Sequence, residues 1–149
     1  MLPTLTLTDT PDEQVYKVIW AKIMEFNIAG SGGPNNYRPL VVVISDPVTQ
    51  EPLGGLWGWT AYTFMHVSLL YIPEEMRTSG LGRQIMKMAE EEALERECKA
   101  AWLDTFSFQA RAFYEKLGFE VFGQIEDYPP GHSRYFLKKV FSVASKCCS

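Results

Sequence analysis

Hydrophobic positions recur at helical spacing near the start of the chain. In the segment "PDEQVYKVIWAKIMEFNIAG", residues 11–30, the apolar side chains lie three or four positions apart: Val15, Val18, Ile19, Ile23 and Phe26. This period predicts an amphipathic helix that ends near Gly30, since glycine commonly terminates helices. The alternating segment "TLTLT", residues 4–8, predicts a short strand before the helix.

Strand patterns follow a loop that is rich in glycine, proline and asparagine, residues 30–39. "LVVVIS", residues 40–45, is a β-branched run typical of a buried strand. "DPVTQEP", residues 46–52, predicts a hairpin turn into a second strand at 53–64, and a third strand is expected at 66–72. The glycines of the second strand indicate bulges, or places where another group approaches the backbone closely.

The second half of the chain alternates helices and strands. From Gly80 onward, an apolar face at period 3.6 predicts a long amphipathic helix: Leu81, Ile85, Met88 and Ala89. Downstream patterns predict a strand at 100–106, a helix at 109–118, and strands at 119–126 and 134–141. Because helices and strands are mixed and several strands are consecutive, the sequence predicts a mixed α/β (α+β) fold.

Length and composition favour one globular domain, residues 1–149, with residues 141–149 as a flexible tail. The formal net charge of -4 gives no basic field, so no nucleic-acid partner is expected. No signal peptide or membrane-spanning run is evident, and we expect a soluble cytoplasmic protein. The three cysteines make neither a disulfide framework nor a metal quartet, and no metal is expected.

The stretch "RTSGLGR", residues 77–83, places two glycines and two arginines where the long helix starts. Glycines let the backbone approach an anion, and the N–H groups of the first helical turn point toward it. A plain turn with solvated arginines is also compatible with this pattern. A dinucleotide-binding loop, with Asp104 as the ribose ligand, fits less well. Ile85 occupies the third small position, and residues 73–79 separate the glycines from the preceding strand. A phosphate-binding P-loop is excluded, since no Gly-Lys-Ser/Thr follows.

The same stretch resembles the Arg/Gln-x-x-Gly-x-Gly/Ala signature of the GNAT superfamily of N-acetyltransferases, with a strand before it and a long helix after it. A second element of that family lies downstream in "ARAFYEKLGF", where the matching residues are Ala110, Phe113, Tyr114, Lys116, Gly118 and Phe119. The resemblance covers about residues 53–141, and the run 103–139 is similar to small bacterial members. It implies a central, mostly antiparallel mixed sheet flanked by helices.

The resemblance also implies acetyl-CoA as the co-substrate, held at three places. The pyrophosphate would contact Arg77 and the backbone of Thr78, Ser79, Gly80, Leu81, Gly82 and Arg83. The pantetheine arm would pair with the strand backbone at Leu70, Tyr71 and Ile72. The helix downstream would contribute Ala110, Phe113 and Tyr114. Ser107 stands where many relatives carry an asparagine that contacts pantetheine, and serine has a shorter reach.

Acetylation of an amine requires a neutral amine, a polarised thioester and a proton for the departing thiolate. The resemblance makes Tyr114 the proton donor, with an ordinary core tyrosine as the alternative. Glu75 and His132 are the candidates for the general base, and Asp127 is placed to orient His132. A solvated loop carboxylate and an exposed histidine are the alternatives for these two residues.

The predicted function is transfer of the acetyl group of acetyl-CoA to a primary amine, by direct attack in a ternary complex. One alternative is a CoA-binding module without catalysis that acts as a sensor or partner protein. Another is a nicotinamide-dependent oxidoreductase. The aromatic residues of the second strand offer an acceptor pocket, a core or a dimer surface: Trp57, Trp59, Tyr62 and Phe64. The resemblance also makes a homodimer plausible.

Overall fold

The computed structural model describes residues 1–142, and the chain divides into two compact units, Met1–Asn35 and Asn36–Ser149. Most of the predicted tail, residues 143–149, lies outside the described residues. Phe141, where the tail was expected to begin, is instead buried, and its N–H donates to the carbonyl of Lys99 at 2.9 Å. The last strand is therefore anchored up to its end.

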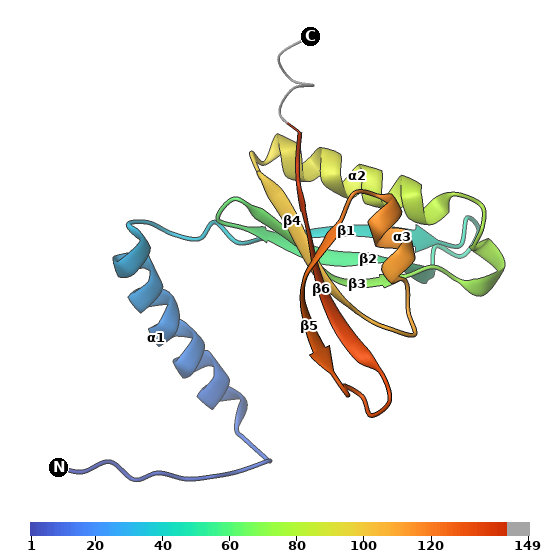
Figure 1. The fold of residues 1–149 in the computed structure, drawn as a ribbon. Helices are drawn as coiled ribbons and strands as arrows, with labels where there is room; N and C mark the ends of the chain where they lie inside the picture. The colour runs from blue at the N-terminus through green and yellow to red at the C-terminus, as the bar shows by residue number, and fades with distance from the viewer. Residues whose placement is uncertain (143–149) are drawn as a thin grey trace. The chain divides into compact units, whose positions relative to one another are not determined.

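The first unit contains helix α1, Glu13–Ser31 (Figure 1). Asp12 caps its start by accepting a hydrogen bond from the N–H of Gln14 at 2.8 Å. At its end Gly32 has φ 87° and donates its N–H to the carbonyl of Ile28 at 3.1 Å. The predicted helix is confirmed, and its stop is Gly32 because that glycine takes the left-handed conformation.

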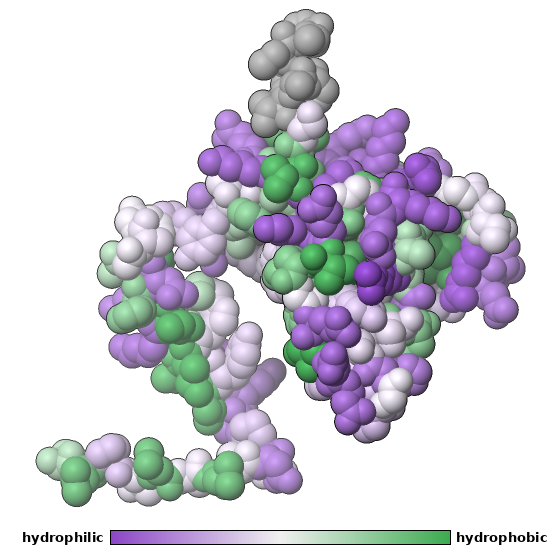
Figure 2. Space-filling view, in the orientation of Figure 1, coloured by the Kyte–Doolittle hydropathy of each residue, from purple (hydrophilic) through white to green (hydrophobic). Residues whose placement is uncertain are grey.

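The rest of the first unit departs from the sequence prediction. Residues 4–8 form no strand, because no other described segment pairs with them. Helix α1 buries none of its residues, and Figure 2 shows hydrophobic side chains along its surface. Its amphipathic pattern is real, but within this unit the apolar side has nothing to pack against.

The second unit is built on a six-stranded sheet with the strand order β1-β2-β3-β4-β6-β5. The strands are β1 Arg38–Ser45, β2 Pro52–Ala61, β3 Phe64–Tyr71, β4 Ala100–Phe106, β5 Glu120–Glu126 and β6 Ser133–Val140. The connections contain η1 Glu74–Met76, α2 Leu81–Glu95 and α3 Arg111–Lys116. The β3–β4 pair is parallel and the other neighbours are antiparallel, which confirms the mixed, mostly antiparallel sheet.

The turn between β2 and β3 was placed wrongly from the sequence. The predicted strand at 53–64 breaks at Tyr62 and Thr63, where Tyr62 has φ 53°. Apolar alternation continues through "TAYTF" without glycine or proline, so the pattern carries no sign of the turn.

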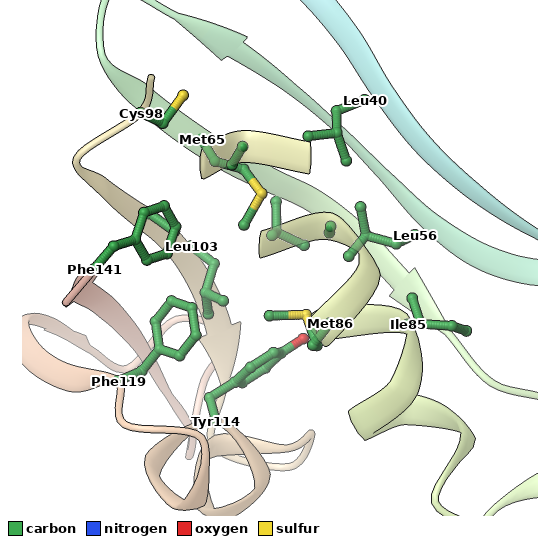
Figure 3. Close-up of a cluster of buried hydrophobic side chains, with 14 of the residues drawn as sticks. Leu40, Leu56, Met65, Ile85, Met86, Cys98, Leu103, Tyr114, Phe119 and Phe141 are labelled. Atoms are coloured by element: carbon green, nitrogen blue, oxygen red, sulfur yellow. The ribbon is translucent and has the colours of Figure 1, made fainter. Parts of the chain in front are cut away.

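Helix α2 covers one face of the sheet, and the core lies between them (Figure 3). Its inward residues are Ile85, Met86, Ala89 and Ala93, all buried. They belong to one cluster with Leu56, Met65 and Leu103 from the sheet. Met88, predicted on the inward face, is half exposed. The amphipathic period thus located the helix correctly, but the predicted buried face wrongly included Met88.

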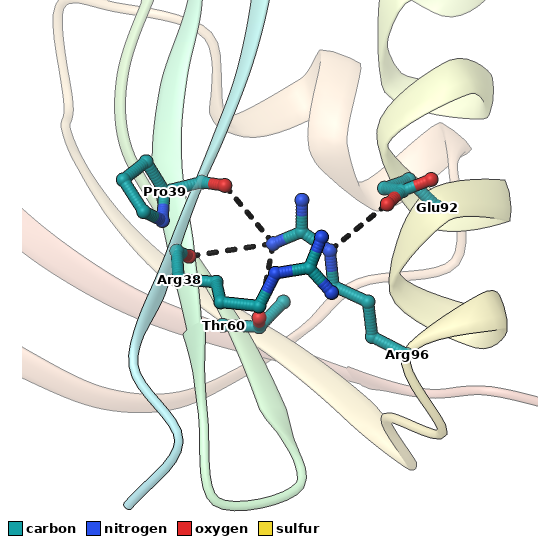
Figure 4. A network of polar contacts seen from close by, with 5 residues as sticks. All are labelled: Arg38, Pro39, Thr60, Glu92 and Arg96. Carbon is teal, nitrogen blue, oxygen red and sulfur yellow. Dashed lines mark hydrogen bonds and ion pairs between the residues drawn. The ribbon is translucent and has the colours of Figure 1, made fainter.

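Arg96 fastens the C-terminal end of α2 to the sheet (Figure 4). Its Nη1 donates to the carbonyl oxygens of Arg38 at 3.3 Å and Pro39 at 3.0 Å, and to Thr60 Oγ1 at 3.1 Å. Its Nε pairs with Glu92 at 3.0 Å, and the side chain is 12% exposed. These contacts of Nε and Nη1 from a largely buried guanidinium fix the helix over the sheet.

Candidate active site

Strands β3 and β4 are paired over only part of their lengths. The parallel ladder joins Phe64–Val67 to Ala100–Leu103 and stops, although β3 continues to Tyr71 and β4 to Phe106. Beyond the ladder, the side of β3 that faces β4 has no strand partner within the described sheet. The backbone there, at Leu69–Tyr71, is available to an extended ligand that would add as a strand.

A bulge in β3 marks the point where the two strands part. Trp57 of β2 faces Leu69 while the next residue, Gly58, faces Val67, so Ser68 is an extra residue in β3. A bulge of this kind bends its strand and increases the local twist. The opening between β3 and β4 therefore begins at Ser68.

The glycine loop follows directly on this open strand. After η1 the chain turns through Thr78 with φ 67° and Gly80 with φ 83°, and Gly80 is the N-cap of α2. A Cβ at Gly80 would meet open space, so its backbone conformation, rather than crowding, calls for glycine. The first helical hydrogen bond runs from the N–H of Gln84 to the carbonyl of Gly80 at 3.0 Å. The three amides before Gln84 have no acceptor within the helix, and they make a cradle for an anion.

Gly82 serves a different purpose from Gly80. A Cβ at Gly82 would lie 3.2 Å from Cζ of Phe113 and 3.8 Å from Cγ1 of Ile72. The missing side chain lets Phe113 of α3 pack against the first turn of α2 and the end of β3. Two sequence elements separated by about thirty residues, each predicted to bind CoA, are therefore in contact through this glycine.

Cationic side chains surround the loop. Arg77 donates its Nε to the carbonyl of Ile72 at 2.9 Å, and its guanidinium lies 5.7 Å from the centroid of the Tyr71 ring. Arg83 is exposed on the first turn of α2. Ser79 closes the loop by donating its hydroxyl to the carbonyl of Met76 at 2.6 Å. Free amides and two guanidinium groups together favour negative charge at the helix start.

Tyr114 lies on α3 and is 7% exposed, packed against Phe113 and Phe119. Burial raises the pKa of Tyr114 to about 12, and the negative charge of Asp104 adds to this effect. Figure 3 shows the Tyr114 hydroxyl pointing toward Met86. The Tyr114 hydroxyl has no hydrogen-bond partner among the described residues. It is not fully buried, because His66 Nδ1 is the one side-chain polar atom of these residues that is both fully buried and unbonded. Tyr114 therefore holds its proton at neutral pH and is a weaker acid than an exposed tyrosine.

The two predicted bases lie in different environments. Glu75 is exposed in η1. His132 is exposed as well, with its Nδ1 3.5 Å from Ser107 Oγ and its ring 4.9 Å from that of Phe108. Asp127 does not orient His132, because its Oδ1 accepts the N–H of Gly131 at 2.9 Å instead. Nothing in the geometry selects one base over the other.

Ser107 and Ala110, predicted to lie near pantetheine, flank the loop before α3. Ser107 donates its N–H to the carbonyl of Ser133 at 2.7 Å and accepts the N–H of Ser133 on its hydroxyl at 3.0 Å. It thus clamps the end of β4 to the start of β6. Ala110 is the N-cap of α3 and packs against the core.

An ion pair that the sequence analysis missed lies at the mouth of the opening. Asp104 follows Leu103, the last residue of the parallel ladder, and its Oδ2 accepts both Nε of Arg134 at 2.8 Å and Nη2 at 2.6 Å. Nearby His66 is buried between the rings of Trp59 and Trp102, at 4.5 and 3.9 Å between centroids. Burial lowers the pKa of His66, and the charge of Asp104 partly opposes this.

Two cavities of the second unit bear on the placement of the acceptor. One, of about 310 Å³, surrounds Arg96 at the far end of β3 from the glycine loop and includes Tyr62 in its lining. The other, of about 410 Å³, lies between the end of β4 and the β5–β6 loop. Trp57, Trp59 and Phe64, offered from the sequence as an acceptor pocket, line neither.

Known proteins resemble this chain in sequence and in fold. The pattern that defines the acetyltransferase (GNAT) family matches residues 9–119. The chain is 35% identical to acetyltransferase Atu2258 of Agrobacterium fabrum, over 91% of this chain and 97% of that protein. It is 37% identical to blasticidin-S acetyltransferase of Streptomyces morookaense, over 60% of this chain and 66% of that protein. A crystal structure from Agrobacterium tumefaciens, assigned as an acetyltransferase, superposes with a TM-score of 0.88 at 34% identity, over 93% of this chain and 100% of that one.

Two further features of residues 1–142 bear on the earlier expectations. None of their helices has both the length and the apolar character of a membrane span. No cluster of three or more histidine, cysteine or acidic side chains in this part has the arrangement of a metal site. The cytoplasmic location stays a prediction.

Proposed function

The chain belongs to the GNAT family of acetyltransferases and is an acetyl-CoA-dependent acyltransferase, and we propose that it acetylates a primary amine by direct attack in a ternary complex. This proposal rests on one observation: the unpaired edge of strand β3 is followed along the chain by the free backbone amides at the start of α2. Strand β3 leaves β4 at Ser68, and the amides of α2 lie one short loop farther along the chain. The extended arm of acetyl-CoA can pair with such a strand edge, and its pyrophosphate can bind such amides.

In this proposal the donor lies along β3 and ends on the glycine loop. The backbone of Leu70, Tyr71 and Ile72 pairs with the pantetheine arm as an added strand. Backbone amides of residues 78–83 hold the pyrophosphate, and Arg77 and Arg83 neutralise its charge. Arg77 already bonds the Ile72 carbonyl, so one side chain connects the strand edge to the loop.

Tyr114 is the proposed proton donor. Acetyl-CoA supplies an activated thioester carbonyl; the amine nitrogen bonds to that carbon, the carbon–sulfur bond breaks, and one amine proton passes to a base. Tyr114 gives its hydroxyl proton to the departing sulfur and regains one from water, so that the products are the amide and the CoA thiol. The hydroxyl is protonated at neutral pH, as a donor must be, and its raised pKa of about 12 also makes it a weaker acid than an exposed tyrosine.

Glu75 and His132 remain the two candidates for the base that receives the amine proton. His132 is held in place by Ser107 and Phe108, whereas Glu75 stands in solvent. The variants Glu75→Gln and His132→Gln separate them: loss of the base should lower kcat most at low pH, where the amine is protonated. If neither variant changes the pH profile, water alone accepts the proton.

Thiol release tests the function directly. The protein is incubated with acetyl-CoA and a panel of primary amines, and free CoA is followed with a chromogenic disulfide. Blasticidin S belongs in this panel, since a relative is named for its acetylation. Amine-dependent thiol release supports the transferase. Saturable binding of acetyl-CoA without turnover on any amine would favour the catalytically inactive CoA-binding sensor.

The quaternary state is proposed on the resemblance alone. We expect a homodimer, and sedimentation equilibrium at micromolar concentration measures it. A mass near 17.0 kDa would contradict the dimer without touching the proposed chemistry.

A further inference from the structure

An aromatic cavity lies at the end of the sheet where β3 and β4 part. Its volume is about 410 Å³, which is the size range of small-molecule sites. It is lined by Phe106, Phe108, Asp127, Tyr128, Pro129 and Pro130. Five of these six side chains are apolar or aromatic, and the remaining one is a carboxylate. None of them takes part in the donor site described above.

Three rings of the cavity are nearly parallel. Phe106 is central: its centroid lies 5.3 Å from that of Phe108 with an interplanar angle of 6°, and 5.9 Å from that of Tyr128 with an angle of 21°. Phe108 and Tyr128 are 57% and 47% exposed, so they present open ring faces. Flat aromatic groups stack on such faces, and cations are attracted to them.

Arg134 connects this cavity to the opening between the strands. Its guanidinium lies 5.5 Å from the Phe106 centroid and 5.4 Å from the Tyr128 centroid, and it bonds Asp104 through Oδ2. Oδ1 of Asp104 has no hydrogen-bond partner among the described residues, and it is not enclosed. Oδ1 of Asp104 is therefore left to accept a hydrogen bond from a ligand. Asp104 lies where β3 and β4 part, one residue beyond the last residue of their parallel ladder.

The charge around the cavity is negative. Asp104 and Asp127 contribute two carboxylates, and Arg134 neutralises one of them through its ion pair. An ammonium group can donate a hydrogen bond to the free oxygen of Asp104, next to the place where the thioester of the proposed donor must lie. The uncompensated charge that attracts it is that of Asp127, since Arg134 balances the charge of Asp104. An anionic acceptor would be repelled, and a neutral one would gain the hydrogen bond without the attraction between charges.

We propose that this is the acceptor site, and that the acceptor is a primary amine, protonated in solution, attached to a planar aromatic or heteroaromatic group. The ring stacks on Phe108, and the ammonium donates a hydrogen bond to Oδ1 of Asp104. This assignment rests on the proposed function, because it identifies the substrate class of that same site.

The test compares two ammonium probes of different shape, tryptamine and hexylamine, by calorimetric titration into the protein saturated with CoA. Stacking predicts that tryptamine binds about tenfold more tightly than hexylamine. Phe108→Leu, on an exposed loop, should reduce that ratio to about two while leaving hexylamine nearly unchanged. Asp104→Asn should weaken both amines about tenfold and preserve the ratio. Glu120→Gln, an exposed carboxylate on β5, is the matched control and should alter neither.

Equal affinities in the native protein, or a ratio that survives Phe108→Leu, would overturn the proposal. If Asp104→Asn lowers the melting temperature because Arg134 loses its partner, the Phe108 comparison decides alone. Binding of CoA is titrated first, so that the two proposals fail separately. Without CoA binding the transferase itself is refuted; with CoA binding and acetylation of both probes at equal rates, only the aromatic acceptor site is refuted.

Discussion

The hydroxyl of Tyr114 offers the sharpest test of the catalytic proposal, through the variant Tyr114→Phe. The substitution removes one oxygen from a side chain that is 7% exposed and leaves the ring packed on Phe113 and Phe119. That oxygen has no hydrogen-bond partner among the described residues, so its removal breaks no polar contact. The fold should therefore survive, and any change in turnover reports on the proton.

The size of the effect on stability follows from the pKa. In the unfolded chain the pKa of the Tyr114 hydroxyl has its ordinary value of 10.0, and in the folded protein burial raises the pKa to about 12. The folded state thus binds more protons between these values, and the stability of the native protein is fully present below pH 10 and falls as pH rises toward 12. Two pKa units correspond to about 3 kcal/mol. The free energy of unfolding of Tyr114→Phe, relative to the native protein, should rise by about this amount between pH 9 and pH 12.

Turnover gives the second half of the test. Loss of a general acid typically lowers kcat by 10²-fold or more, about 3 kcal/mol. The affinity for acetyl-CoA should stay within about twofold, because the hydroxyl is not needed for donor binding. Thiol release over pH 6–10 measures kcat, and calorimetry measures binding. A kcat equal to that of the native protein across this range would refute the acid role, whatever the alkaline stability shows.

Three further perturbations probe the supports of the site. Gly80→Ala places a Cβ where φ is 83°, so we expect a loss of about 1 kcal/mol in chemical denaturation and weaker CoA binding; unchanged affinity would contradict the cradle. Arg96→Met removes the hydrogen bonds to Thr60 and to two backbone carbonyls, so the free energy of unfolding should fall by about 3 kcal/mol. A fall of less than about 0.5 kcal/mol would contradict the anchoring role. His66 has a lowered pKa, so the unfolded chain takes up its proton first and stability falls as pH drops below the ordinary histidine value. His66→Phe should lose less stability than the native protein between pH 7.5 and pH 5, and equal losses would contradict the burial argument.

Local patterns predicted the elements well where one strong period is bounded by a stop signal. Helix α2 is amphipathic and preceded by glycine, and its start was predicted to within one residue. The end of β2 was missed because its turn uses Tyr62 and Thr63, neither of which breaks a strand pattern. A residue that adopts positive φ without being glycine leaves no mark in the sequence.

The site was predictable only in its local parts. The glycine loop and Tyr114 are recognisable because they belong to continuous motifs. The contact between Gly82 and Phe113 is a tertiary contact, and neither segment's sequence alone predicts it. Asp104 was considered only as a ribose ligand, since a single acidic residue in a strand pattern does not reveal its partner; Arg134 reaches it from β6, thirty residues away. The register of the sheet, rather than any motif, brings these two side chains together.

The central claim is that CoA lies along the open edge of β3 and ends on the first turn of α2. Amide chemical-shift mapping of the ¹⁵N-labelled protein during titration with CoA tests it most directly. The account predicts saturable shifts that are largest at residues 70–72 and 78–83, with little change around the cavity at Arg96. Shifts concentrated at Arg96 and Arg38, or none that saturate, would contradict it.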